Sequence, residues 1–242
     1  MCNFIKVFIF ISLSMISPIY AIEVAPMVIT FSPFETSQIP SSTIYNDLSR
    51  DVAFEIQVYE VRFDPLGLSE PSLIPLEDSP LWVFPPLLYL KSGKNQRIQF
   101  RWLGEAVPKT DKTYQVSLIE QSVKNEPEEK QSKLTVLLNI NLIVHIDQLQ
   151  MLPNLNIENI TLDQDSIVAK VVNNGDGASR LSDYDMSIFY NGVKREMYYK
   201  DQLKSQGYDV FFPPLSSAFI RVPLDFFVAN SNSKKLHIEL FK

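Results

Sequence analysis

The side chains that could support catalysis or metal binding are sparse in this chain of 242 residues. Its two histidines, His145 and His237, are too few for most metal sites or catalytic triads, and both fall in segments with a strand pattern. A packed or surface-facing histidine is the simplest interpretation of each. The sequence also contains no glycine-rich phosphate-binding motif. We therefore expect no enzymatic activity, no cofactor and no bound nucleotide.

Pairs of aspartates occur in two predicted turns, at Asp163 with Asp165 and at Asp183 with Asp185. Such pairs could contribute to a calcium site, but calcium takes about six to eight oxygen ligands, and too few carboxylates here have a fixed spacing. The glutamates and lysines of residues 124–133 form a mixed charged run that is typical of a solvated loop. Calcium binding stays an alternative, and we expect no bound metal.

The first residues have the features of a secretory signal peptide. In residues 1–21, Lys6 precedes an apolar run, and Ala21 provides a small residue for cleavage. Cys2 is the only cysteine, so a chain cleaved after Ala21 can form no internal disulfide and has no thiolate chemistry. No later segment approaches the roughly 18 consecutive apolar residues that a membrane-spanning helix needs. These features predict an exported, soluble protein without stable membrane insertion.

The composition excludes one class of partner and sets the scale of the fold. A formal net charge of -6 makes nucleic acid an unfavourable partner. Hydrophobic residues make up 45% of the chain, which is enough for a substantial core. The length suits two domains of about 100 residues each or one large sandwich.

The most informative stretch is residues 132–147, where every second position carries a large aliphatic side chain. A period of two is typical of an extended strand with one apolar face. The row consists of Leu134, Val136, Leu138, Ile140, Leu142, Val144 and Ile146. Its length of about fourteen residues exceeds that of an ordinary strand. Either the row is a long core strand of a β-sandwich, or part of it is lent to another protein as a missing strand.

Segments with a period of two and turn signals recur along the chain, and the first half has no convincing amphipathic helix. This pattern predicts an all-β fold of two β-sandwiches. Pro153 and the lack of a period in residues 148–156 place the boundary there, so the predicted domains are residues 22–147 and 148–242. Asn191-Gly192 is a hairpin signal. The expected strands are residues 22–31, 51–63, 113–123, 157–162, 167–172, 186–190, 219–222 and 236–241, with two more around a turn in residues 82–103 and a long connection in residues 64–80.

Several motifs of the first half occur in an order that resembles the periplasmic pilus chaperones of the chaperone–usher pathway. They are L-W-V-F-P-P at residues 81–86, then Leu90 with Gly93, Gln96 and Arg101, then Y-Q-V-S-L-I-E at residues 114–120, and then the long aliphatic row. In the second half, V-N-N at residues 172–174 and F-P-P-L-S-S at residues 212–217 match more loosely.

The resemblance implies two immunoglobulin-like domains set at an angle, in the periplasm of a Gram-negative bacterium. A pilin or fimbrial subunit that lacks its final strand would bind to the first domain. The long strand would replace the missing one until delivery to an outer-membrane usher. The side chains expected to enter the subunit groove are Leu134, Val136, Leu138 and Ile140. The rest of the row, from Leu142 onward, is expected to complete the core of the chaperone.

The chain departs from the resembled family at the site that holds the terminal carboxylate of the subunit. Family members use an arginine of the first strand and a lysine of the long strand, whereas the matching positions here are Met27 or Val28 and Asn141. Burying a carboxylate without a cation is costly. We therefore consider Arg101 and Asn141 as candidate anchors, although a solvated surface role is the simpler interpretation of Arg101.

An exported structural or adhesive fibre subunit is the alternative function. Such a subunit usually carries a donor extension near its mature N-terminus, whereas this chain enters a strand directly after Ala21. The aliphatic row also lies internally, between the two predicted domains. Both features favour the chaperone.

Overall fold

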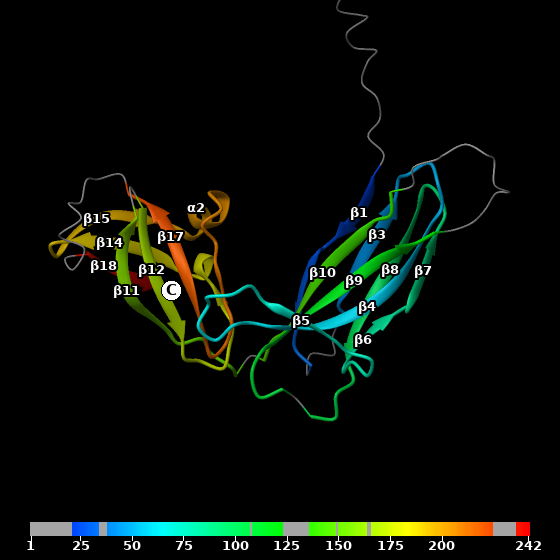
Figure 1. Ribbon diagram of the computed structural model, residues 1–242, viewed down its shortest axis with the longest axis horizontal. Coiled ribbons are helices and arrows are strands. Elements are labelled where there is room, and N and C mark those ends of the chain that lie inside the picture. Colours follow the sequence, from blue (N-terminus) through cyan, green and yellow to red (C-terminus); the bar gives the residue numbers. More distant parts are fainter. Residues whose placement is uncertain are drawn as a thin grey trace, which may run out of the picture.

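The computed structural model describes residues 21–33, 38–106, 108–122, 136–148, 150–163, 166–224 and 236–242. The predicted signal peptide, with Cys2 and Lys6, lies outside these residues except for Ala21. Strands dominate the described chain and form two β-sandwiches that meet at an angle (Figure 1). The all-β fold predicted from the sequence is confirmed.

The first sandwich contains two sheets. One has the strand order β1 (Ile22–Ala25), β3 (Ser41–Asn46), β8 (Lys94–Trp102) and β6 (Leu81–Phe84). The other has the order β2 (Val28–Phe31), β10 (Asn139–Ile146), β9 (Lys112–Gln121), β4 (Val52–Arg62) and β5 (Ser72–Pro75). A further strand, β7 (Leu87–Leu90), also pairs with β4. β10 pairs with β9 in the antiparallel sense and with β2 in the parallel sense.

Alternating side chains of these strands meet between the two sheets and form the first hydrophobic core. Phe54 and Leu118 are at most 1% exposed. From β10, the core receives Leu142, Val144 and Ile146, each 0% exposed. Each such side chain stabilises the fold by roughly 1.5–3 kcal/mol relative to an exposed one. The last three residues of the aliphatic row therefore complete this core, as the sequence predicts.

Several strand boundaries differ from the sequence-based expectations. Residues 22–31 form two strands in different sheets, because Pro26 interrupts the segment and lacks the N–H that a ladder requires. The apolar and polar residues of β3, β5 and β15 (Val193–Tyr198) alternate too weakly for the sequence to predict these strands. The long strand is shorter than expected, because β10 begins at Asn139. Residues 136–138 precede it without strand geometry, and Leu134 lies outside the described residues.

The second sandwich packs two three-stranded sheets around its own core. One sheet consists of β11 (Leu155–Asp163), β12 (Ser166–Asn173) and β17 (Ser216–Pro223), and the other of β15, β14 (Asp185–Tyr190) and β18 (Leu236–Phe241). The remaining elements are the short pair β13 (Ser179–Arg180) and β16 (Phe211–Phe212) and two short helices, η1 (Leu181–Asp183) and α2 (Lys200–Ser205). The predicted hairpin turn joins β14 to β15. Its residues Asn191 and Gly192 have φ values of 54° and 76°, as a type I′ turn requires.

Asp111, directly before β9, ties the first sandwich to the second. One carboxylate oxygen accepts the Ala178 N–H at 2.7 Å, and the other accepts the Gln148 N–H at 3.2 Å. The Asp111 N–H donates to the Asp176 carbonyl at 3.1 Å. Burial raises the pKa of the Asp111 carboxyl even though the Ala178 N–H opposes this shift. One acidic residue thus bonds to backbone groups of both the linker and the second sandwich.

The loop between β4 and β5 makes a second contact, visible in Figure 1 as the cyan loop that reaches toward the second sandwich. The Pro65 carbonyl accepts the N–H and the hydroxyl of Ser217 at 2.9 and 2.8 Å. Gly67 has a φ of 66°, and a Cβ atom there would lie 2.2 Å from the Ser217 carbonyl oxygen. Only glycine accommodates both the dihedral and the close approach. The rings of Phe63 and Phe211 also meet here, with centroids 5.5 Å apart.

Candidate functional site

Strand β10 is paired unequally on its two sides. It pairs with β9 along its full length, from Asn139 opposite Ile119 to Ile146 opposite Lys112. On its other side, β2 pairs only with residues 143–146. No strand of the described chain covers that side of residues 139–142. These four residues form an open strand edge, which we call the open edge.

The direction of the backbone groups at the open edge follows from their neighbours. The Ile143 N–H donates to the Met27 carbonyl at 2.9 Å, on the β2 side. The Leu138 carbonyl accepts the Glu120 N–H at 2.9 Å, on the β9 side. Because the backbone groups of successive strand residues point to opposite sides, those of Asn139 and Asn141 face the open edge with those of Ile143. The N–H and carbonyl groups of Asn139 and Asn141 are therefore available to hydrogen-bond to a partner strand.

The aliphatic row becomes steadily more exposed toward its N-terminal end. Leu142 is 0% exposed, Ile140 and Leu138 are half-buried, and Val136 is 65% exposed. Leu137, in the opposite phase, is 50% exposed. Ile140 and Leu138 still pack against the first core. The C-terminal part of the aliphatic row therefore lies in the core of the sandwich, whereas the apolar side chain of Val136, at the N-terminal end of the described row, is exposed to solvent.

This combination suits strand addition by another protein. Backbone groups of an exposed edge give affinity, and alternate side chains give specificity by filling pockets in the partner. Exposed apolar edges are otherwise unfavourable, because they promote aggregation, and proteins usually cover or charge them. The open edge carries neither a charge nor a proline within residues 139–142.

Asn141 lies on the outer face of the sheet, within a row of polar side chains. Its Oδ1 accepts a hydrogen bond from the Ser117 hydroxyl at 2.7 Å, and that hydroxyl accepts one from Gln115 Nε2 at 3.0 Å. The side chain of Asn141 is exposed, and its amide nitrogen has two N–H donors. Asn141 can therefore offer hydrogen bonds to an acceptor that lies against this face, but it offers no charge.

Arg101, the second predicted anchor, lies on β8 in the opposite sheet. Its guanidinium carbon stands 5.7 Å from the centre of the Trp82 ring, a cation–π contact on the outer surface. The structure therefore does not bring Arg101 and Asn141 together. Val28, which the parallel register places beside Ile143, is 48% exposed and apolar.

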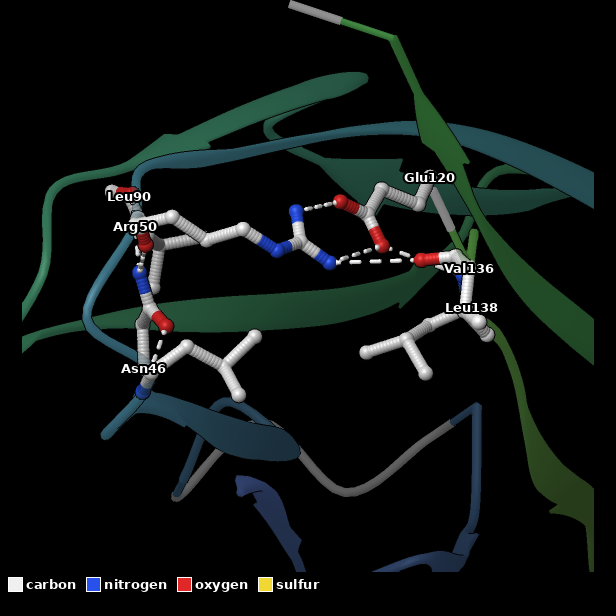
Figure 2. Close-up of polar contacts among 7 residues, drawn as sticks. Asn46, Arg50, Leu90, Glu120, Val136 and Leu138 are labelled. Carbon is white, nitrogen blue, oxygen red and sulfur yellow. Dashed lines mark hydrogen bonds and ion pairs between the residues drawn. The ribbon is translucent and has the colours of Figure 1, made fainter. Parts of the chain in front are cut away.

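The site also contains an ion pair between Glu120 and Arg50, which the residue pattern along the chain does not predict (Figure 2). Glu120 follows Val116 and Leu118 in the inward-facing phase of β9, and its side chain is 1% exposed. Its two oxygens accept hydrogen bonds from both terminal nitrogens of Arg50, and this contact raises the pKa of Arg50. A glutamate in the core-facing phase of a strand is unusual and is the signal that could have revealed the site. Arg50 lies 70 residues earlier in the chain, and no feature of the sequence around it indicates that it pairs with Glu120.

The two histidines occupy structural positions. His145 Nδ1 lies 3.0 Å from Thr113 Oγ1, and its ring centre lies 4.9 Å from that of Phe211 in the second sandwich. Burial, assisted by the nearby positive charge of Arg180, lowers the pKa of His145 to about 4. A neutral His145 therefore packs between the sandwiches. His237 is exposed and lies 3.2 Å from Glu239.

The aspartate pairs of the predicted turns make local contacts where they are described. Asp163 pairs with Arg221 at 2.6 Å. Asp183 and Asp185 each accept a backbone N–H, at 2.7 and 3.0 Å. Asp165 lies outside the described residues. Over the described ranges, no group of three or more His, Cys, Asp or Glu residues could hold a metal ion, and no helix in those ranges is long and apolar enough to cross a membrane.

A scan against protein-family models gives no match, and a search of curated proteins gives no significant match. Solved structures do match. The class 5 fimbriae chaperone CfaA superposes with a TM-score of 0.54 at 14% identity, over 92% of this chain and 99% of that one. A chain from a chaperone–tip adhesin complex of CFA/I fimbriae biogenesis gives a TM-score of 0.53 at 14% identity, over 91% of this chain and 98% of that one.

A third match comes from the CsuC–CsuE complex of Acinetobacter baumannii, a chaperone–tip subunit pre-assembly complex of archaic chaperone–usher pili. It gives a TM-score of 0.51 at 13% identity, over 93% of this chain and 98% of that one. At these identities the similarities concern the fold. The chain has the fold of the CfaA chaperone, which confirms the predicted pair of immunoglobulin-like β-sandwiches.

Proposed function

We propose that this chain is a periplasmic chaperone that binds pilin-like or fimbrial subunits by adding a strand to them. The observation that carries the proposal is the open edge of β10, which adjoins the exposed end of the aliphatic row at Val136. The fold shared with the CfaA fimbrial chaperone supports the same function. So does the fold shared with a chain of the CsuC–CsuE complex, in which a chaperone holds a tip subunit.

In this proposal, the subunit lacks one strand and adds β10 to its own sheet. Asn139 and Asn141 supply the backbone hydrogen bonds at the open edge. The side chains that enter the groove of the subunit are Val136, Leu138 and Ile140, together with Leu134, which lies outside the described residues. Burying four such side chains contributes roughly 6–12 kcal/mol before the opposing terms are counted. The loss of translational and rotational freedom on association offsets part of this.

The proposed cycle needs no cofactor and no chemical step. The donated strand covers the groove of the subunit and prevents edge-to-edge aggregation. At an outer-membrane usher, a strand from another subunit that fits the groove better replaces β10. Release is therefore an exchange of strands driven by the difference in binding free energy.

The end of the subunit chain would lie against the outer face of β10. We keep Asn141 as the proposed contact for its carboxylate, because this side chain is exposed on the donor strand itself. Arg101 lies on the opposite sheet and would serve only a subunit that reaches around the sandwich. A neutral amide binds a carboxylate more weakly than the basic pair of the resembled family does. The apolar row must then supply a larger share of the binding free energy.

We also propose that residues 1–21 direct export and are removed, and that the mature domains are residues 22–147 and 148–242. The two separate hydrophobic cores support this division, because the first includes residues 29–146 and the second residues 167–238. Export to the periplasm would place the chain where pilin-like subunits fold.

Co-purification from the periplasm tests the proposal. The wild-type chain and a Val136→Asp/Leu138→Asp variant are each expressed together with the exported proteins that the neighbouring genes encode. The proteins that co-purify with each form are identified by their masses in mass spectrometry. The matched control is Val193→Asp/Phe219→Asp, which places two carboxylates at exposed apolar positions of the second sandwich. The free variants are compared by circular dichroism and urea unfolding.

The proposal predicts that the wild type and the control retain a β-rich subunit in equal molar amount and that the folded Val136→Asp/Leu138→Asp variant loses it. If that variant retains the same protein as the wild type, strand addition through β10 is wrong. If no form retains a partner, the chain is better explained as an exported structural subunit.

A further inference from the structure

The open edge begins beside a buried ion pair. The Glu120 carboxylate is almost fully buried and binds Arg50 through both oxygens, whereas the Arg50 side chain is 42% exposed. Burying ions has a large desolvation penalty, and an apolar side chain at such a position is often as stable or more stable. A leucine would also continue the inward row of Val116 and Leu118 without this penalty. The ion pair therefore calls for an explanation other than stability of the core.

Glu120 holds both backbone groups of Leu138, a proposed donor residue. Its carboxylate accepts the Leu138 N–H at 3.0 Å, and its own N–H donates to the Leu138 carbonyl at 2.9 Å. Arg50 Nη2 lies 3.5 Å from the Val136 carbonyl. Figure 2 shows the Arg50 side chain extending across to Glu120, which lies beside Val136 and Leu138. Residues 136–138 are therefore fixed by side-chain hydrogen bonds, although the regular strand β10 begins only at Asn139.

The arginine is itself fixed by a buried asparagine (Figure 2). Asn46 is 0% exposed, and its Nδ2 donates to the Arg50 carbonyl at 2.9 Å and to the Leu90 carbonyl at 3.1 Å. Its Oδ1 accepts the Leu48 N–H at 3.1 Å. These bonds fix the turn between β3 and β4, so Arg50 projects from a well-supported backbone. A continuous set of hydrogen bonds thus connects this turn with the donor segment.

We propose that Glu120, supported by Arg50, is a positioning residue that holds residues 136–138 in register with β9 before a subunit binds. The inference rests on the proposed function, since it concerns the segment that would enter the subunit. Each residue that must be ordered on binding opposes association, so a segment held in advance binds more tightly. The Glu120 carboxylate takes the place of the regular ladder at the end of β9, where the Leu138 N–H bonds to a side chain.

The test compares two replacements of Glu120 of similar size. Glu120→Leu removes the acceptor for the Leu138 N–H, whereas Glu120→Gln keeps an amide oxygen that can accept it. Arg50 can turn to solvent in either variant, because it is already partly exposed. Asp163→Leu is the control, since it breaks an ion pair in the second sandwich. Glu120→Met is the replacement if the leucine variant does not fold.

Two measurements are made on each folded variant. The first is amide hydrogen exchange at Leu138 in the free protein, with Leu118 as an internal reference. The second is the dissociation constant for the subunit that co-purifies with the wild-type chain, separated in urea and added back. We expect Glu120→Leu to speed exchange at Leu138 and to weaken subunit binding, each by about tenfold to a hundredfold, the range for losing one hydrogen bond to a charged group. Glu120→Gln should keep most of the exchange protection at Leu138 and most of the affinity for the subunit, and Asp163→Leu should change neither quantity.

The outcomes separate the inference from the proposed function. Unchanged exchange at Leu138 in folded Glu120→Leu would overturn the positioning role whatever the subunit does. Faster exchange with unchanged subunit binding would also overturn it, while the proposed function would stand if Val136→Asp/Leu138→Asp loses the subunit. If Val136→Asp/Leu138→Asp binds the subunit as well as the wild type does, strand addition fails, and the inference fails with it.

Discussion

Replacing Asn139 by proline tests which backbone groups face the open edge. Proline has no N–H, and its ring would occupy the space that a partner strand must approach. Because the Asn139 N–H points away from β9, the substitution removes no bond from the ladder between β9 and β10. Proline is tolerated on edge strands where its nitrogen faces outward. The variant should therefore fold but should not accept a partner strand.

The matched variant is Ile140→Pro, one residue further along the same strand. Its missing N–H is directed at Leu118 on β9, so a carbonyl in the sheet loses its donor. We expect Ile140→Pro to lower the free energy of unfolding by about 1–3 kcal/mol for that carbonyl alone, with a further loss from the half-buried isoleucine side chain. Asn139→Pro should lower it by less than about 1 kcal/mol, as most surface substitutions do.

The assay combines urea unfolding with titration of the co-purified subunit. Asn139→Ala is the control, because it removes the same side chain and keeps the N–H. Asn139→Pro should bind the subunit at least about tenfold more weakly than Asn139→Ala, since it loses one hydrogen bond and blocks the approach of the partner. If Asn139→Pro is destabilised as much as Ile140→Pro, the assigned direction of the backbone groups is wrong. If it folds and binds like Asn139→Ala, the open edge is not the binding surface.

Two further predictions concern the contact between the sandwiches. The pKa of His145 is about 4 in the folded chain against an ordinary value of 6.5, so the folded state binds fewer protons than the unfolded state between these values. The stability that the neutral imidazole contributes is therefore complete above pH 6.5 and is lost as the pH falls toward 4, a loss of about 3 kcal/mol in the free energy of unfolding. Urea unfolding at neutral and acid pH should show this loss in the wild type but not in His145→Gln. An equal loss in the variant would contradict this role of His145. Gly67→Ala should lower the free energy of unfolding by about 1–3 kcal/mol more than Gly93→Ala, the usual cost of forcing extra atoms into a packed site, because both glycines have positive φ but only a Cβ at Gly67 would meet the Ser217 backbone. Equal losses would show that the close approach of Gly67 is not important.

The sequence predicts those parts of the fold that depend on local patterns. The alternation from Leu142 to Ile146 predicts a strand with one buried face, and the structure buries the side chains in that phase completely. The Asn191-Gly192 pair predicts a hairpin, because few other residues adopt positive φ at two successive positions. These features need only the residue types along a short segment, so no tertiary information is required.

The features that the sequence does not predict depend on long-range pairing. Whether Arg101 faces the same side as Asn141 depends on which sheet each strand joins, and the alternation within a strand does not contain that information. The pairing of Arg50 with Glu120 joins a turn to a strand 70 residues away. The start of β10 at Asn139 depends on the partner of the Leu138 N–H, which bonds to the Glu120 side chain and so does not continue the backbone ladder with β9. Each of these is decided by the three-dimensional arrangement of strands.

Amide hydrogen exchange at Asn139 and Asn141, with and without the co-purified subunit, tests the central claim most directly. In the free chain, these two amides should exchange much faster than those of Ile140 and Leu142, which face β9. In the complex, Asn139 and Asn141 should become protected by at least about tenfold, because their N–H groups then bond to the added strand. Unchanged fast exchange at Asn139 and Asn141 in a stable complex would contradict strand addition at the open edge.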